Sequence, residues 1–129
     1  MEQKKKIMIV DDNLIDQMIT AHVLKTNLVN REVLVMESAI LALDYLQTNE
    51  NNPEAIPSII FLDLDMPGMN GIEFMQHFKN LEPSLKNACR VIVLTGSDIQ
   101  ADIESISAEP DVVKLLTKPL RKHEIIPMI

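Results

Sequence analysis

The sequence predicts an α/β domain in which helices cover both faces of a parallel β-sheet. Four short apolar runs rich in β-branched residues alternate with longer segments of helical spacing, and they occupy residues 7–10, 59–62, 91–94 and 112–116. Such runs are typical of strands buried on both faces of a parallel sheet. With a shorter strand at residues 32–36, the chain is expected to form one doubly wound, five-stranded domain over residues 1–129.

The first half of the chain supplies two helices. Asn13 can cap the first, in which Ile15, Met18, Ile19 and His22 follow helical spacing until the helix ends near residues 26–27. Ser38 can cap the second, which carries Leu41, Ala42, Tyr45 and Leu46. Residues 49–57 are polar, contain two prolines and are expected to form a surface loop.

The second half begins with a loop dense in turn residues, 66–71, which leads into a helix starting near Gly71. The residues expected to point inward from this helix are Ile72, Phe74, Met75 and Phe78. Residues 81–88 are expected to be a plain connection to the next strand. Ser97 or Asp98 can cap the following helix, and a last helix is expected after Pro119. The apolar residues of the helix after residue 98 are Ile99, Ile103 and Ile106.

Composition and charge limit the classes of partner. The formal net charge is −7, from 12 Lys+Arg against 19 Asp+Glu, so the field of the domain repels phosphate backbones and direct nucleic-acid binding is not expected. No apolar run approaches membrane-spanning length, and the N-terminus is too charged for a signal peptide. Cys89 is the only cysteine, which fits a reducing compartment, and the expected location is cytoplasmic.

Polar, potentially reactive side chains follow four of the expected strands. Asp11 and Asp12 follow the first, Asp63 the third, Thr95 the fourth, and Lys118 lies just past the fifth. The carboxyl ends of parallel strands share one edge of the sheet, where ligands of such folds bind. Close carboxylates repel one another unless one holds a proton or a cation lies among them.

Two interpretations of the acidic residues are open from the residues alone. Asp11-Asp12-Asn13 could simply be a helix-capping turn after a strand. The presence of Asp63, Thr95 and Lys118 at equivalent strand ends favours a binding site instead. Mg²⁺ prefers carboxylates together with water and phosphate oxygens, and the lack of His or Cys nearby argues against zinc.

These elements resemble the receiver domain of two-component response regulators over nearly the whole chain. The resemblance is carried by the order and spacing of four motifs: Asp11-Asp12, residues 62–71 (LDLDMPGMNG), residues 93–96 (VLTG) and Lys118-Pro119. It implies the flavodoxin-like strand order 2-1-3-4-5.

The resemblance also implies roles for the acidic residues. Asp63 would accept a phosphoryl group from a phosphohistidine on a sensor histidine kinase or a histidine phosphotransfer protein. Asp12 and Asp63 would bind Mg²⁺ directly, together with the backbone carbonyl of Asp65, and Asp11 would bind it through water. The acyl phosphate formed would hydrolyse slowly by itself, so the domain would be a timed switch and not a turnover enzyme.

The remaining implied roles concern the switch. Lys118 would hold a phosphoryl oxygen, and the Thr95 hydroxyl would bond it after transfer. Signalling to a downstream protein would follow from repacking of the helix after residue 98 and the fifth strand, a surface that would include Ile99, Ile103 and Leu115. Helical spacing allows the two isoleucines to be plain core residues instead.

The chain departs from the family pattern at two positions. Leu115 stands where relatives often carry Tyr or Phe, so any signal must travel through backbone and aliphatic repacking. Asp65 adds a carboxylate two residues after Asp63 and could repel a phosphoryl group or be a solvent-facing loop residue. If it faces the site, Asp65→Asn is expected to change the lifetime of the phosphoryl group.

Three alternatives are open. Residues 61–65 also resemble the signature of haloacid-dehalogenase phosphatases. That signature belongs on a first strand, however, and the family's acidic metal ligands should follow the lysine, where this sequence ends too soon to supply them. A receiver-like domain that binds partners without being phosphorylated is the second alternative. The third concerns context, since the domain could be freestanding or the first part of a longer regulator.

Overall fold

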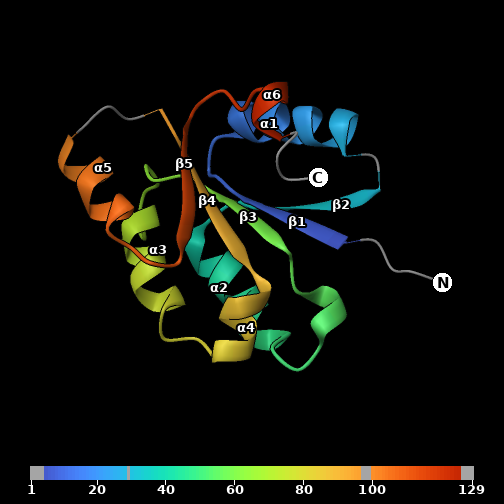
Figure 1. Ribbon diagram of the computed structural model, residues 1–129, viewed down its shortest axis with the longest axis vertical. Helices are drawn as coiled ribbons and strands as arrows, with labels where there is room; N and C mark the ends of the chain where they lie inside the picture. The colour runs from blue at the N-terminus through green and yellow to red at the C-terminus, as the bar shows by residue number, and fades with distance from the viewer. Residues whose placement is uncertain (1–4, 29, 97–99, 126–129) are drawn as a thin grey trace.

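A computed structural model of the protein describes residues 5–28, 30–96 and 100–125 and shows a five-stranded, fully parallel sheet in the order β2-β1-β3-β4-β5 (Figure 1). The expected fold and strand order are therefore confirmed. The strands are β1 (Lys5–Val10), β2 (Arg31–Met36), β3 (Ile59–Leu62), β4 (Arg90–Thr95) and β5 (Val112–Thr117). Every strand runs the same way, so all five carboxyl ends lie along one edge of the sheet.

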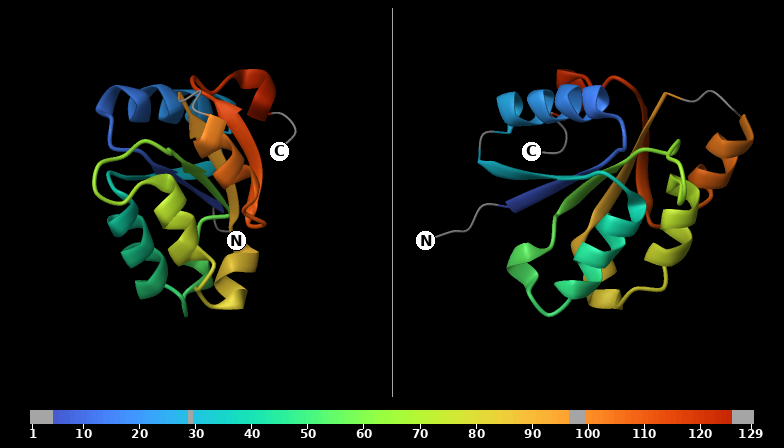
Figure 2. Two further views of the ribbon diagram at one scale, coloured as in Figure 1. Left: turned by 90° about the vertical axis from the view of Figure 1, so that its left-hand side faces the viewer. Right: turned by 180° about the vertical axis from the view of Figure 1, so that it is seen from behind.

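Helices cover both faces of the sheet, with α1 and α6 on one face and α2, α3, α4 and α5 on the other (Figures 1 and 2). The helices are α1 (Leu14–Asn27), α2 (Ala39–Thr48), α3 (Gly71–Phe78), α4 (Pro83–Ala88), α5 (Gln100–Ser107) and α6 (Lys122–Ile125), with a 3₁₀ turn at Pro53–Ala55. Among the described residues, no helix combines the length and apolar character needed to cross a membrane.

Helix α4 corrects one prediction, because residues 81–88 were expected to be a plain connection. Pro83 opens this short helix, and Leu85 is its buried residue. Because only one side chain of this helix points inward, the sequence has no apolar repeat that would reveal it. The available signal was Pro83, since proline is favoured at the first position of a helix.

The core is divided by the sheet into two layers. One layer contains the large residues Phe74 and Phe78 of α3 together with Leu62, and the other contains Ile9 and Phe61 of the strands. Cys89 is buried, and burial raises the pKa of its thiol to about 12.

Helix α1 has the expected bounds, but its apolar repeat does not mark its buried face. The N-cap is Asn13, whose side chain accepts from the Asp16 N–H. Ile15 and Met18 are 68% and 63% exposed, respectively, and the residues buried from α1 are Gln17, Thr20 and Leu24. Helical spacing therefore predicted the helix correctly without revealing which side of it faces the sheet.

Helix α3 agrees with its prediction more fully. Asn70 and Glu73 form a reciprocal capping box at its start, and Phe74, Met75 and Phe78 are buried. Ile72 is half-buried. Ser38 caps α2 as predicted. The predicted caps of α5, Ser97 or Asp98, and the predicted apolar residue Ile99 lie outside the described residues.

Candidate functional site

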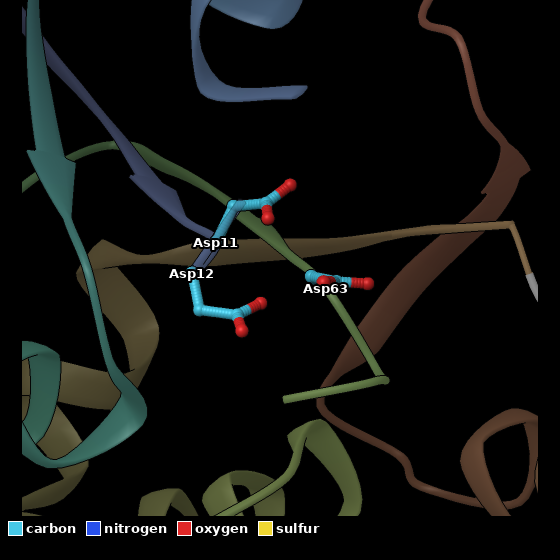
Figure 3. Close-up of side chains that lie close together, drawn as sticks. All are labelled: Asp11, Asp12 and Asp63. Carbon is cyan, nitrogen blue, oxygen red and sulfur yellow. The ribbon is translucent and has the colours of Figure 1, made fainter. Parts of the chain in front are cut away.

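Three carboxylates meet at the carboxyl ends of β1 and β3. The side chains of Asp11, Asp12 and Asp63 extend beyond these two strands (Figure 3), and one oxygen from each lies within 4.8 Å of the others. Asp11 and Asp63 are buried and Asp12 is exposed, so the cluster opens to solvent on one side.

Backbone hydrogen bonds fix the two buried aspartates. The Asp11 N–H donates to the Met36 carbonyl of β2 (3.1 Å), and the Asp63 N–H donates to the Val10 carbonyl of β1 (3.0 Å). The Asp11 carboxylate also accepts from the Asn13 N–H (2.9 Å). The sheet pattern thus extends one residue past the regular strands and holds both carboxylates in place.

Lys118 reaches into the cluster from the segment after β5. Its Nζ lies 2.9 Å from Asp11 Oδ2, 3.5 Å from Asp63 Oδ2 and 2.8 Å from Asp16 Oδ2. The Lys118 N–H donates to the Thr95 carbonyl (2.8 Å), which fixes the chain where β4 and β5 end. The predicted convergence of Lys118 with the carboxylates is therefore present.

The two central ionisable groups have strongly shifted pKa values. Burial raises the pKa of Asp63 to about 6, against the opposing attraction of Lys118 and with added repulsion from Asp11. Burial alone would lower the pKa of Lys118, but hydrogen bonds to Asp16 and Asp11 and the charge of Asp63 raise it above its ordinary value. Lys118 is therefore a fixed cation at the site.

Thr95 and Asp65, the remaining predicted site residues, differ in exposure. Thr95 is buried at the end of β4, opposite Thr117 in the register of the sheet. Asp65 is exposed in the loop after β3, and its N–H donates to Asp63 Oδ1 (3.3 Å). A pocket of about 330 Å³ lies beside this loop, lined by Leu64, Asp65, Met66, Pro67, Asn70 and Ile72.

The backbone of Gly71, at the start of α3, lies very close to the backbone at the end of β3. A Cβ on Gly71 would lie 2.6 Å from the Asp63 carbonyl oxygen and 2.9 Å from Leu64 Cα. The Gly71 N–H donates to the Leu64 carbonyl (3.0 Å), so α3 begins in direct contact with the end of β3. Only glycine allows this approach without displacing backbone.

Sequence reasoning missed two residues of α1 that contact the site. Asp16 pairs with Lys118, and the Gln17 side chain donates to the Asp11 carbonyl (2.7 Å). Both lie near the start of the helix that follows Asp11. Their position in the sequence could therefore have predicted that they lie close to the carboxyl end of β1. The partner of Asp16 was not predictable in this way, because Lys118 is 102 residues away from Asp16 in the chain.

The donor set fits a hard divalent cation. Three carboxylates offer oxygen ligands, and the open side at Asp12 leaves room for water and a phosphoryl oxygen. Mg²⁺ and Mn²⁺ both suit such ligands.

The chain belongs to the response regulator receiver domain family, whose sequence profile matches residues 7–129. It is 32% identical over 128 residues to response regulator Rcp1 of Synechocystis sp., covering 97% of this chain and 84% of that protein. It is also 29% identical to the two-component response regulator ARR17 of Arabidopsis thaliana, covering 97% and 82% of the two chains. The protein is therefore a receiver domain of the two-component type, a phosphorylatable signalling switch.

Solved structures agree with this assignment. The crystal structure of the Mn²⁺-bound form of Rcp1 matches with a TM-score of 0.75 at 31% identity, covering 96% of this chain and 88% of the other. A receiver protein from Dyadobacter fermentans matches with a TM-score of 0.83 at 29% identity, covering 96% and 94%. The phosphatase alternative gains no support, because Asp63 follows the third strand in sequence and not the first.

Proposed function

We propose that Asp63 is the phosphoryl acceptor of this receiver domain. The observation that carries the proposal is its environment: Asp63 is buried at the end of β3, shares a cluster with Asp11 and Asp12, and lies 3.5 Å from the Lys118 ammonium. An acceptor needs an anionic oxygen beside positive charge that can neutralise the incoming group.

Mg²⁺ is the proposed cofactor. Asp12 and Asp63 would bind it directly, with the backbone carbonyl of Asp65, and Asp11 would bind it through water. Support comes from the carboxylate oxygens within 4.8 Å of one another and from their open, solvent-facing side. When bound, Mg²⁺ supplies positive charge to the phosphoryl oxygens during transfer.

In the proposed reaction, the donor is a phosphohistidine on a sensor histidine kinase or a histidine phosphotransfer protein. A carboxylate oxygen of Asp63 forms a bond to phosphorus while the phosphorus–nitrogen bond breaks, and the departing imidazole takes up a proton. Lys118 holds one phosphoryl oxygen. The acyl phosphate formed on Asp63 is hydrolysed later by water, which resets the domain.

The proposed switch runs through the β4 and β5 side of the site. A phosphoryl group adds charge and acceptor oxygens, and the Thr95 hydroxyl would bond to it. Thr95 and Lys118 are joined by a backbone hydrogen bond, so movement of one shifts the other. Ile103 and Leu115 are half-buried, which suits a surface that repacks against a downstream protein. Phosphorylation would bias two packings already in equilibrium.

The domain would act as a switch over residues 1–129, in the cytoplasm, without direct contact with nucleic acid or membrane. The negative net charge of −7 supports the exclusion of nucleic acid. Some relatives carry a catalytic activity in their names, such as the protein-glutamate methylesterase/protein-glutamine glutaminase 2 of Dechloromonas aromatica. This chain covers only 30% of that protein, so its activity is not transferred here.

The proposal is tested by intact-mass measurement of the protein with Mg²⁺ and a small acyl-phosphate donor, beside Asp63→Asn. The parent is expected to gain one phosphoryl group, and the gain should disappear with a chelator or in the variant. An equal gain in Asp63→Asn would contradict the proposed acceptor. In the same assay, Asp65→Asn is predicted to change the phosphoryl lifetime; an unchanged lifetime would fit its exposed position and reject a role for its carboxylate.

A further inference from the structure

Asp16 is a fourth carboxylate at the site, and it lies outside the group of three that could hold a metal. It belongs to the first turn of α1, where its backbone N–H donates to the Asn13 side chain (3.0 Å). That capping contact fixes the Asp16 backbone, so the side chain is presented to Lys118 by the start of the helix. The Asp16 side chain is 35% exposed and the Lys118 side chain 17%.

The position of Asp16 affects how many carboxylates surround the Lys118 ammonium. An ammonium has three N–H donors, and Lys118 has three carboxylate neighbours: Asp16 at 2.8 Å, Asp11 at 2.9 Å and Asp63 at 3.5 Å. The ammonium therefore has three carboxylates within 3.5 Å before any phosphoryl group arrives. An incoming phosphoryl oxygen must therefore compete with carboxylates for the ammonium.

Asp16 is the partner with no other role in the site. Asp11 and Asp63 would turn toward Mg²⁺ and the acceptor chemistry, and their hold on Lys118 would weaken as the cation binds. Asp16 is not among the three carboxylates that could hold the cation and keeps its position on α1, so its contact with Lys118 persists. The negative charge of Asp16 also repels an approaching anionic donor.

We infer that Asp16 is a positioning residue that competes with the incoming phosphoryl group for Lys118 and so limits the rate at which Asp63 is phosphorylated. This inference rests on the proposed function of Asp63. The slow rate is thereby attributed to one carboxylate on α1. Replacing Asp16 leaves the proposed metal ligands and the proposed acceptor unchanged.

The test compares the initial rate of phosphorylation of the parent and Asp16→Asn, with saturating Mg²⁺ and a small acyl-phosphate donor. The variant is expected to react about three- to tenfold faster, the range for one ordinary hydrogen bond, because partial exposure of Asp16 weakens its ion pair with Lys118. Equilibrium binding of beryllium fluoride with Mg²⁺, a phosphoryl mimic, should tighten by a similar factor. Asp16→Glu retains the charge and should keep the slow rate.

Two controls separate this role from a general effect of charge. Asp44→Asn removes an exposed carboxylate from α2, on the other face of the sheet, and should leave the rate unchanged. In a Lys118→Met background, adding Asp16→Asn should no longer accelerate the reaction, because the competition requires the ammonium.

Three results would overturn the inference. Asp16→Asn could react at the parent rate, it could accelerate the reaction equally without Lys118, or Asp44→Asn could accelerate it as much. In each case the parent is still phosphorylated on Asp63 and the proposed function stands. If neither the parent nor any variant gains a phosphoryl group or binds beryllium fluoride, the proposed function fails and the inference fails with it.

Discussion

Helices α1 and α3 follow the two strands that carry the acidic cluster, yet they use their side chains in opposite ways. Both begin at an asparagine N-cap, Asn13 for α1 and Asn70 for α3. Helix α3 buries Phe74, Met75 and Phe78, whereas α1 exposes its large apolar residues near the N-terminus and buries Gln17.

The difference shows that α3 contributes mainly to the stability of the fold, whereas α1 contributes contacts to the acidic site. The apolar face of α3 fills the core beneath the sheet, while the polar residues of α1 contact the site: Gln17 the Asp11 carbonyl, and Asp16 the Lys118 ammonium. Substitutions in α3 should therefore affect mainly folding, and substitutions in the first turns of α1 mainly the site.

The largest expected effect is on α3. Phe74 is fully buried and stacks against Phe78 with ring centroids 6.0 Å apart, so Phe74→Ala should lower the free energy of unfolding by about 3–5 kcal/mol. Ile15→Ala on the exposed side of α1 should change it by less than about 0.5 kcal/mol. Urea denaturation measures both, and similar losses would refute the contrast.

The second effect is a pH dependence at the cluster. Asp63 has a pKa raised from 3.8 to about 6, so the folded state keeps a proton that the unfolded chain loses between these values. The free energy of unfolding should therefore fall as pH rises through this window, by about 1–3 kcal/mol, in metal-free protein.

Asp63→Asn removes that titration. The variant should be more stable than the parent above about pH 6, and the difference should shrink toward pH 4. Asp44→Asn serves as the control for loss of one exposed carboxylate. Denaturation curves of the three proteins across pH test this, and a constant difference between Asp63→Asn and the parent would contradict the burial argument.

The third effect concerns the junction of β3 and α3. Gly71→Ala forces the Asp63 carbonyl and the start of α3 apart, because the new Cβ would lie 2.6 Å from that oxygen. A loss of about 1–3 kcal/mol in unfolding free energy and slower phosphorylation are expected. Gly96→Ala is the matched control, since its Cβ meets nothing within 4 Å. Equal stability of the two variants would be evidence against the close approach.

The smallest effect is on α1. Gln17→Met removes the buried donor to the Asp11 carbonyl and should cost about 1 kcal/mol while weakening Mg²⁺ binding. Gln76→Met makes the same change at an exposed position of α3 and should alter neither quantity. Chemical denaturation and metal titration measure the two effects. If Gln17→Met left the Mg²⁺ affinity unchanged, Gln17 would stabilise the fold without contributing to the metal site.

The sheet and the central site were predictable because four of the five strands are mainly apolar runs followed by a polar residue. Asp11, Asp12, Asp63 and Lys118 accordingly meet where they were expected. Helix α4 and the buried side of α1 were not predictable in the same way. Leu85 gives no apolar repeat, and Gln17 is buried through a hydrogen bond to backbone that periodicity does not encode.

The central claim is that the phosphoryl group is carried on Asp63, and chemical mapping tests it most directly. Borohydride reduces an acyl phosphate on aspartate to homoserine, which marks the residue permanently for peptide mass spectrometry. After incubation with Mg²⁺ and an acyl-phosphate donor, we expect homoserine at position 63 and nowhere else in the acidic cluster. Homoserine at position 11, 12 or 65, with position 63 unchanged, would contradict the account.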